Sequence, residues 1–167
     1  AETVDDNDNL GEVEKLNDKY RQRSRQLRAA LLPKAALRKA LKLEKQHDKE
    51  VAAAAEKAGE TEARRRVFVL DFKGDIRATG VTALREEISA VLTLAEPADR
   101  VVLRLESGGG MVHSYGLAAA QLARIRERGI PLTVCVDKVA ASGGYLMACV
   151  ADRVVAAPFA MLGSIGV

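Results

Sequence analysis

The stretch that decides the fold is "RVVLRLESGGGMVHSYGLAAAQLARIRERGIPLTVCVD", residues 100–137. It begins and ends with short runs rich in β-branched residues, 100–106 and 131–137, which predict strands. Between them, residues 113–128 have the apolar spacing of a helix that ends at Gly129. A strand, a helix and a second strand in this order predict a βαβ unit with parallel strands.

The same alternation continues on both sides of this stretch. Residues 66–72 predict a strand and 81–95 a helix, whereas 142–151 predict a short buried helix and 152–158 a fourth strand. Because the strands are short and nearly all apolar, we expect both faces of the sheet to be buried. The predicted fold class is therefore α/β, with a largely parallel, helix-covered sheet.

The residues before the first strand differ in charge from the rest. Residues 1–18 contain one basic side chain against seven acidic ones, and residues 19–66 contain fifteen basic against six acidic. Residues 67–167 contain ten of each sign, so the basic pI of about 9.0 comes from the preceding arm. The composition of residues 10–57, interrupted at Pro33, predicts a charged helical arm after an acidic tail at 1–9.

A basic arm could bind nucleic acid or anionic lipid, or it could be a solvated helical face. Tyr20 is its only aromatic residue, so base stacking is not expected and we predict no nucleic-acid partner. A narrow apolar stripe suggests packing on another helix or on the domain: Leu16, Tyr20, Leu27, Leu31, Leu37 and Leu41. We therefore divide the chain into an arm, 1–66, and a domain, 67–167. Neither part contains 18 consecutive apolar residues, the length that would indicate a membrane-spanning helix.

The first candidate site element is the loop "SGGG" after the strand 100–106. Gly108, Gly109 and Gly110 permit unusual backbone dihedral angles, so this loop could bring N–H groups close to an oxyanion. Ligands of α/β folds gather at loops that leave the carboxyl ends of parallel strands, as this one does. The alternative is a tight strand-to-helix turn that binds nothing.

The second candidate element is "AASGGY", residues 140–145. Ser142 would open the following helix, where the Gly143 N–H could point at an oxyanion. The alternative is an N-cap serine, which the same position favours for reasons unrelated to catalysis. The two loops together would supply a nucleophile and a pair of donors, the minimal set for acyl transfer.

A serine nucleophile needs a general base, and the residues offer only weak candidates. His113 and Asp137 could complete a Ser-His-Asp arrangement with Ser142, although a first-turn helix position explains His113 equally well. Lys138 lies four residues before Ser142, and we expect its ammonium to point to solvent. His47 lies far away in the arm.

Metal and cofactor chemistry is not indicated by the sequence. Cys135 and Cys149 lie in apolar runs, "LTVCV" and "LMACV", and neither has a nearby His or Cys that would complete a zinc site. Buried thiols are the expected state of both. We predict no metal site and no cofactor.

Three segments together resemble a known family: "VFVLDFKGDI", residues 101–167 and the basic arm. They are similar to the SohB-type branch of the signal-peptide-peptidase A family of bacterial serine proteases, through "S-x-GG", "AASGGY" and "GSIGV" at this spacing. The resemblance covers 67–167 strongly and 10–66 in character, as the membrane-proximal region. It implies a ClpP/crotonase-type spiral of βαβ units and a serine endopeptidase with a Ser-Lys dyad.

The resemblance also assigns the site residues: the nucleophile Ser142, the oxyanion donors Gly110 and Gly143, and the substrate-loop residues Gly108 and Gly109. The family usually has proline where this chain has Gly108, which loosens the loop but keeps the donors. The family's general-base lysine lies some tens of residues beyond "GSIGV". No lysine follows Lys138 here, so this role is not carried over.

The chain starts with Ala and stops in an apolar run, so we interpret it as an N-terminal fragment that is inactive alone. For the full-length protein the resemblance implies a peptide substrate in extended conformation, a homo-oligomer, and association with the bacterial inner membrane through a missing N-terminal helix. The side of the membrane stays open. Two alternatives also stay open: a crotonase-like acyl-CoA-binding enzyme, and a non-catalytic membrane-surface scaffold.

Overall fold

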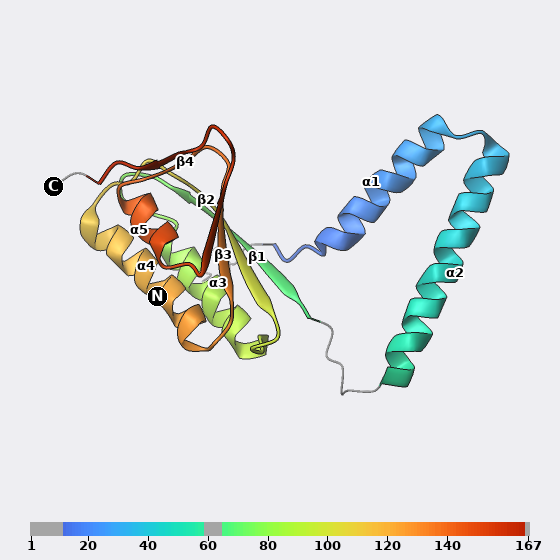
Figure 1. Cartoon of the computed structure of the whole chain (residues 1–167), viewed down its shortest axis with the longest axis horizontal. Helices are drawn as coiled ribbons and strands as arrows, with labels where there is room; N and C mark the ends of the chain where they lie inside the picture. The colour runs from blue at the N-terminus through green and yellow to red at the C-terminus, as the bar shows by residue number, and fades with distance from the viewer. Residues whose placement is uncertain (1–11, 59–64, 166–167) are drawn as a thin grey trace, which may run out of the picture. The chain divides into compact units, whose positions relative to one another are not determined.

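The computed structural model describes residues 12–58 and 65–165, and the side chains of all these residues except 55–58. The chain divides into two units, one within residues 12–64 and one formed largely by residues 65–167 (Figure 1). The acidic tail expected at residues 1–9 lies outside the described residues. None of the helices in the described ranges is both long and apolar enough to cross a bilayer.

The arm consists of two helices, α1 (Leu16–Leu31) and α2 (Lys34–Ala58). They are separated at Leu32 and Pro33, as predicted, because a proline ring disfavours helical dihedrals in the residue before it. Helix α1 buries no residue, and the apolar stripe is exposed at Leu27 and Leu31.

Ion pairs connect the two helices of the arm. Glu44 of α2 accepts hydrogen bonds from Arg25 at 3.0 Å and from Arg28 at 3.4 Å, both on α1. Arg21, one turn before Arg25, lies 3.5 Å from Asp48, one turn after Glu44. The partners run in opposite directions along the chain, so α1 and α2 are antiparallel.

The second unit contains a six-stranded sheet in which every pairing is parallel. Its strands are β1 (Val67–Gly74), β2 (Arg100–Ser107), β3 (Leu132–Val136), β4 (Val139–Ala141), β5 (Arg153–Ala156) and β6 (Met161–Gly163). Strand β2 pairs with β1 along one edge, and with β3 and then β4 along the other. The predicted α/β class with a largely parallel sheet is confirmed.

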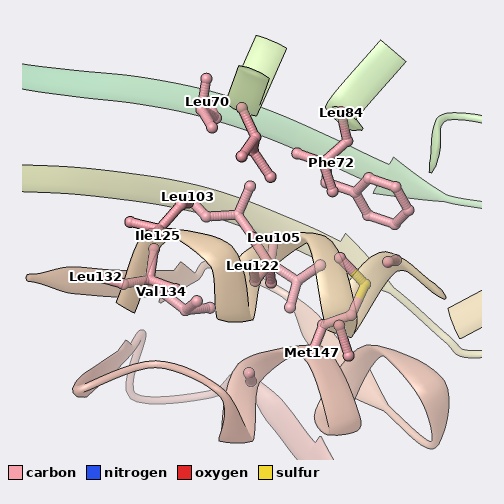
Figure 2. Close-up of a cluster of buried hydrophobic side chains, with 14 of the residues drawn as sticks. Leu70, Phe72, Leu84, Leu103, Leu105, Leu122, Ile125, Leu132, Val134 and Met147 are labelled. Atoms are coloured by element: carbon pink, nitrogen blue, oxygen red, sulfur yellow. The ribbon is translucent and has the colours of Figure 1, made fainter. Parts of the chain in front are cut away.

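Three helices pack on one face of this sheet: α3 (Val81–Leu94), α4 (Val112–Glu127) and α5 (Gly143–Cys149) (Figure 1). Figure 2 shows Leu103 and Leu105 of β2 lying beside Leu122 of α4 and Met147 of α5. All four side chains are at most 2% exposed. Burial of a side chain of this size is worth about 1.5–3 kcal/mol, so this layer is the main source of stability in the unit.

The expectation that both faces of the sheet are buried is wrong for β1 and β2, which have one solvated face, and for β5, whose four residues are all exposed. Burial alternates along β2, with Val101, Leu103 and Leu105 inside and Arg104 exposed. Arg104 pairs with Asp71 of β1 on the outer face. The charged residues of β2 stand at alternate positions because one face meets the helices and the other meets solvent.

Two short strands, β4 and β6, are absent from the sequence prediction, which treats their residues as loop. Three residues are too few to show a period of two, so the sequence pattern could not reveal them. Both matter to the site. Strand β4 ends immediately before Ser142, and the carbonyl of Gly163 in β6 accepts the Ser142 N–H at 2.7 Å.

Candidate active site

Ser142 occupies a sharp turn between β4 and α5, with φ of 50° and ψ of −118°. A positive φ is costly for a non-glycine residue and persists only where the surroundings enforce it. Two backbone hydrogen bonds hold this turn: Ser142 N–H to Gly163 at 2.7 Å, and Leu146 N–H to the Ser142 carbonyl at 3.0 Å. Such a strand-turn-helix arrangement presents a serine hydroxyl outward.

The Ser142 hydroxyl does not cap the helix. The residue stands at the N-cap position of α5, yet its side chain makes no capping hydrogen bond, and the residue is exposed. A capping serine would have extended backbone dihedrals and would accept the N–H two or three residues on. The geometry therefore does not support the N-cap alternative, and it leaves the hydroxyl available for chemistry.

The glycine loop lies directly against this turn. Gly109 has a φ of +88°, and a methyl group there would lie 2.6 Å from Ser142 Cβ and 2.7 Å from the Ala141 carbonyl oxygen. The same methyl would lie 2.9 Å from the Gly143 backbone nitrogen. No side chain fits in this space, so the sequence needs glycine at 109 for the two loops to meet.

The two expected oxyanion donors are also closely packed. A methyl group at Gly110 would lie 2.1 Å from the Ile76 carbonyl oxygen, and one at Gly143 would lie 2.3 Å from Tyr115 Cγ. Gly108 differs, because its methyl group would meet nothing within 4 Å. The Gly110 N–H makes no hydrogen bond to any residue in the described ranges. Gly143 is the first residue of α5, where N–H groups lack an intrahelical acceptor.

Two buried hydroxyls that the sequence reasoning missed support the glycine loop. Ser107 ends β2 and accepts the Gly109 N–H at 3.0 Å, and its oxygen lies 2.6 Å from the Tyr115 hydroxyl. Tyr115 in turn donates to the Asp75 carbonyl at 2.7 Å. A tyrosine on the apolar face of a predicted helix, eight residues after a serine at a strand end, was the available signal.

The segment after β1 forms the wall beside the glycine loop. The Met111 N–H donates to the Ile76 carbonyl at 2.8 Å. Thr79 donates its backbone N–H at 2.9 Å and its hydroxyl at 2.8 Å to the Asp75 carboxylate. These two bonds from Thr79 hold the pKa of the Asp75 carboxyl below its usual value, because they favour its ionised form.

The structure does not bring a general base to Ser142. Lys138 donates to both Glu106 carboxylate oxygens, at 3.2 and 3.1 Å, and it is exposed as expected. His113 and Asp137 are exposed, and no hydrogen bond joins either to Ser142 within residues 65–165. The Ser-His-Asp arrangement is therefore not assembled. His47 belongs to the other unit.

Neither cysteine is placed as expected. Cys135 is half-buried and Cys149 is exposed, and both are free thiols. Helix α5 turns Met147 and Ala148 toward the core, which leaves Cys149 on its outer side. A hydrogen bond with Cys149 raises the pKa of the neighbouring Tyr145 hydroxyl. Among the side chains that the structure describes, no group of three or more His, Cys, Asp or Glu could hold a metal ion.

Comparison with known families gives this geometry a context. Residues 2–122 match the profile described as Peptidase family S49 N-terminal, and residues 124–167 match that of Peptidase family S49. The chain belongs to peptidase family S49. The resemblance seen in the sequence is thereby confirmed, and the Ser142 turn and the glycine loop are features of an S49 chain.

Curated S49 relatives share this part of the sequence. The Probable protease SohB of Haemophilus influenzae is 65% identical over 114 residues, which are 66% of this chain and 32% of that protein. The Probable protease SohB of Buchnera aphidicola subsp. Acyrthosiphon pisum is 64% identical over 104 residues, 62% of this chain and 31% of that protein. The Putative signal peptide peptidase SppA of Enterococcus faecium is 34% identical over 67 residues, 40% of this chain and 20% of that protein.

The S49 chain thus spans about a third of the length of the SohB relatives that it matches. Among solved structures, a putative enoyl-coA hydratase from Mycobacterium avium paratuberculosis K-10 matches with a TM-score of 0.39 and 23% identity. That match covers 56% of this chain and 43% of the hydratase, and it is too distant to assign an activity.

Proposed function

We propose that the full-length S49 protein is a serine endopeptidase in which Ser142 is the nucleophile. The observation that carries this proposal is the conformation of Ser142: an exposed, uncapped hydroxyl on a strained strand-to-helix turn, with a glycine loop against it. A helix cap needs neither the positive φ nor the apposed loop. Peptidase family membership supplies the chemical class.

In this mechanism the Ser142 oxygen attacks the carbonyl carbon of the scissile peptide bond. The N–H groups of Gly110 and Gly143 stabilise the negative charge that develops on the carbonyl oxygen, and the two loops that carry them are in contact. The acyl-enzyme forms as the amine leaves, and water then hydrolyses the ester.

No general base lies beside Ser142 among the residues that the structure describes, so we propose that its proton goes to a base outside this sequence. The family resemblance implies a lysine, which acts as a base near pH 7 only when burial lowers its pKa. Lys138 is exposed and paired with Glu106, which makes it unsuitable. We therefore propose that the 167-residue chain alone does not cleave peptides.

The substrate class and the setting rest on the resemblance. By that resemblance, an extended peptide with a small apolar side chain would bind beside the glycine loop. Assembly into a homo-oligomer and association with the inner membrane of a bacterium are part of the same proposal. The arm would then form the membrane-proximal region.

The decisive experiment is labelling of the full-length protein with a fluorophosphonate probe, which reacts with activated serines. Wild type should be labelled and Ser142→Ala should not, whereas Ser114→Ala, a serine in the first turn of α4, should be labelled like wild type. Equal labelling of wild type and Ser142→Ala would remove Ser142 from the mechanism. An unlabelled wild type that acyl-CoA stabilises against heat would favour the acyl-CoA alternative.

A further inference from the structure

Two buried hydroxyl groups lie next to the glycine loop without a role in the reaction described so far. Ser107 is 2% exposed and Tyr115 is fully buried. Their oxygens are 2.6 Å apart. A buried hydroxyl destabilises a protein unless it is hydrogen-bonded, so the partners of these two groups decide what they contribute.

The hydrogen bonds of these hydroxyls run in one direction. Tyr115 donates its proton to the Asp75 carbonyl at 2.7 Å, so its oxygen accepts the proton of Ser107. The Ser107 oxygen accepts the N–H of Gly109 at 3.0 Å. Each hydroxyl has one proton, and this arrangement uses each proton once. This series of hydrogen bonds therefore fixes the direction of the Gly109 N–H relative to the end of β1.

The ring of Tyr115 also contacts the second loop. A methyl group at Gly143 would lie 2.3 Å from Tyr115 Cγ and 2.6 Å from its Cβ, so the backbone after Ser142 rests on this ring. At the other end of the side chain, a methyl group at Gly74 would lie 2.4 Å from the Tyr115 hydroxyl. One side chain thus touches the end of β1 and both loops of the site.

We propose that Ser107 and Tyr115 are positioning residues that set the Gly110 and Gly143 N–H groups around the Ser142 hydroxyl. This inference rests on the proposed function. Ser107 fixes the Gly109 N–H, and the φ of +88° at Gly109 then directs the next peptide, which carries the Gly110 N–H. The Gly110 N–H makes no hydrogen bond within residues 65–165, so the direction of this N–H depends on the backbone conformation of Gly109.

The test is Tyr115→Phe in the full-length protein. This variant keeps the ring, which packs edge-on against Phe72 with centroids 6.4 Å apart, and it removes only the hydroxyl. If loss of the hydroxyl displaces the Gly110 and Gly143 N–H groups, the protein binds the transition state less tightly, whereas binding of the substrate changes little. We expect kcat to fall by about tenfold to a hundredfold while KM changes by less than about twofold.

The matched control is Ile88→Val, which removes a methylene from a fully buried residue of α3. It should lower Tm by an amount comparable with Tyr115→Phe and leave kcat near the wild-type value. Ser107→Ala should resemble Tyr115→Phe, and the double variant should be no slower than Ser107→Ala alone. An equal loss of kcat in Ile88→Val would overturn the positioning role.

A second measurement separates this inference from the proposed function. Selective 15N-glycine labelling of the same protein reports the backbone resonances of Gly109, Gly110 and Gly143. These should shift in Tyr115→Phe and stay in place in Ile88→Val, whether or not the protein cleaves peptides. Unchanged glycine resonances in Tyr115→Phe would overturn the positioning inference alone, whereas a wild type that is inert to substrate and probe would overturn the proposed function.

Discussion

The arm and the unit that contains the sheet show two different ways of holding helices in place. No side chain described in residues 12–54 is buried, whereas residues 65–165 contain 21 buried hydrophobic residues. The arm helices are connected by exposed ion pairs such as Arg25 to Glu44. Among the described residues, only the unit that contains the sheet has a core able to enforce a strained turn such as that of Ser142.

The largest contrast should come from truncating one leucine in each region. Leu103 of β2 is fully buried and Leu27 of α1 is 63% exposed. Leu103→Ala should lower the free energy of unfolding by about 2–5 kcal/mol, because it removes buried atoms and leaves a cavity. Leu27→Ala should change it by less than about 0.5 kcal/mol. Urea unfolding followed by circular dichroism measures both, and similar losses would mean that the arm has a core of its own.

The next contrast lies within the glycine loop. Gly110→Ala would place a methyl group 2.1 Å from a backbone oxygen of Ile76, whereas Gly108→Ala would place one in open space. We expect Gly110→Ala to cost about 1–3 kcal/mol of stability and Gly108→Ala less than about 0.5 kcal/mol. Probe labelling of the full-length variants should fall with the first substitution only. Tolerance of Gly110→Ala in both assays would mean that the loop can move away from Ile76.

A smaller, pH-dependent contrast concerns Asp99. Hydrogen bonds from the Arg66 guanidinium lower the pKa of the Asp99 carboxyl from 3.8 to about 2. A depressed folded-state pKa gives stability that is fully present above pH 3.8 and is lost as the pH falls through about 2. Asp99→Asn should therefore lower the urea midpoint at pH 7, and the difference from wild type should shrink between pH 4 and pH 2. A difference that stays constant over this range would exclude the ion pair as its source.

The smallest effect is expected for the ion pairs of the arm. Glu44→Gln removes the acceptor of both Arg25 and Arg28, whose side chains are 51% and 44% exposed. Exposed ion pairs contribute little, so the free energy of unfolding should change by less than about 0.5 kcal/mol at 0.15 M salt. The same urea titration with and without added salt checks this. A loss above 1 kcal/mol would show that these pairs hold the arm together.

The order of elements in the unit that contains the sheet could be predicted from the sequence because it depends on local periodicity. Strands β1, β2 and β3 and helices α3 and α4 differ from their predicted ranges by at most two residues at either end. Apolar and charged residues alternate along β2, where Val101 and Leu103 are buried and Arg104 is exposed. This alternation indicates a solvated face of the sheet, which the prediction overlooked. Local sequence patterns were therefore enough to predict the order and the bounds of these strands and helices.

The geometry of the site depends on contacts that local patterns do not encode. The φ of Ser142 depends on Gly163, 21 positions later in the sequence. The Tyr115 hydroxyl meets the Asp75 carbonyl, 40 positions earlier. The sequence identified the two loops and their glycines, but it could not show that the serine hydroxyl is uncapped or that Ser107 and Tyr115 lie beneath the loop.

The hydrogen bond from Ser142 to Gly163 has a consequence for the order of events during synthesis. A nascent chain that has released Ala141 but not yet Gly163 has no acceptor for the Ser142 N–H and no β6 beside β4. One of the two hydrogen bonds that hold the positive φ of Ser142 is then missing, so we expect the turn to relax. The strained turn at Ser142, the proposed nucleophile, is therefore completed only after the chain has been extended past Gly163, later than β1, β2 and β3 and their helices.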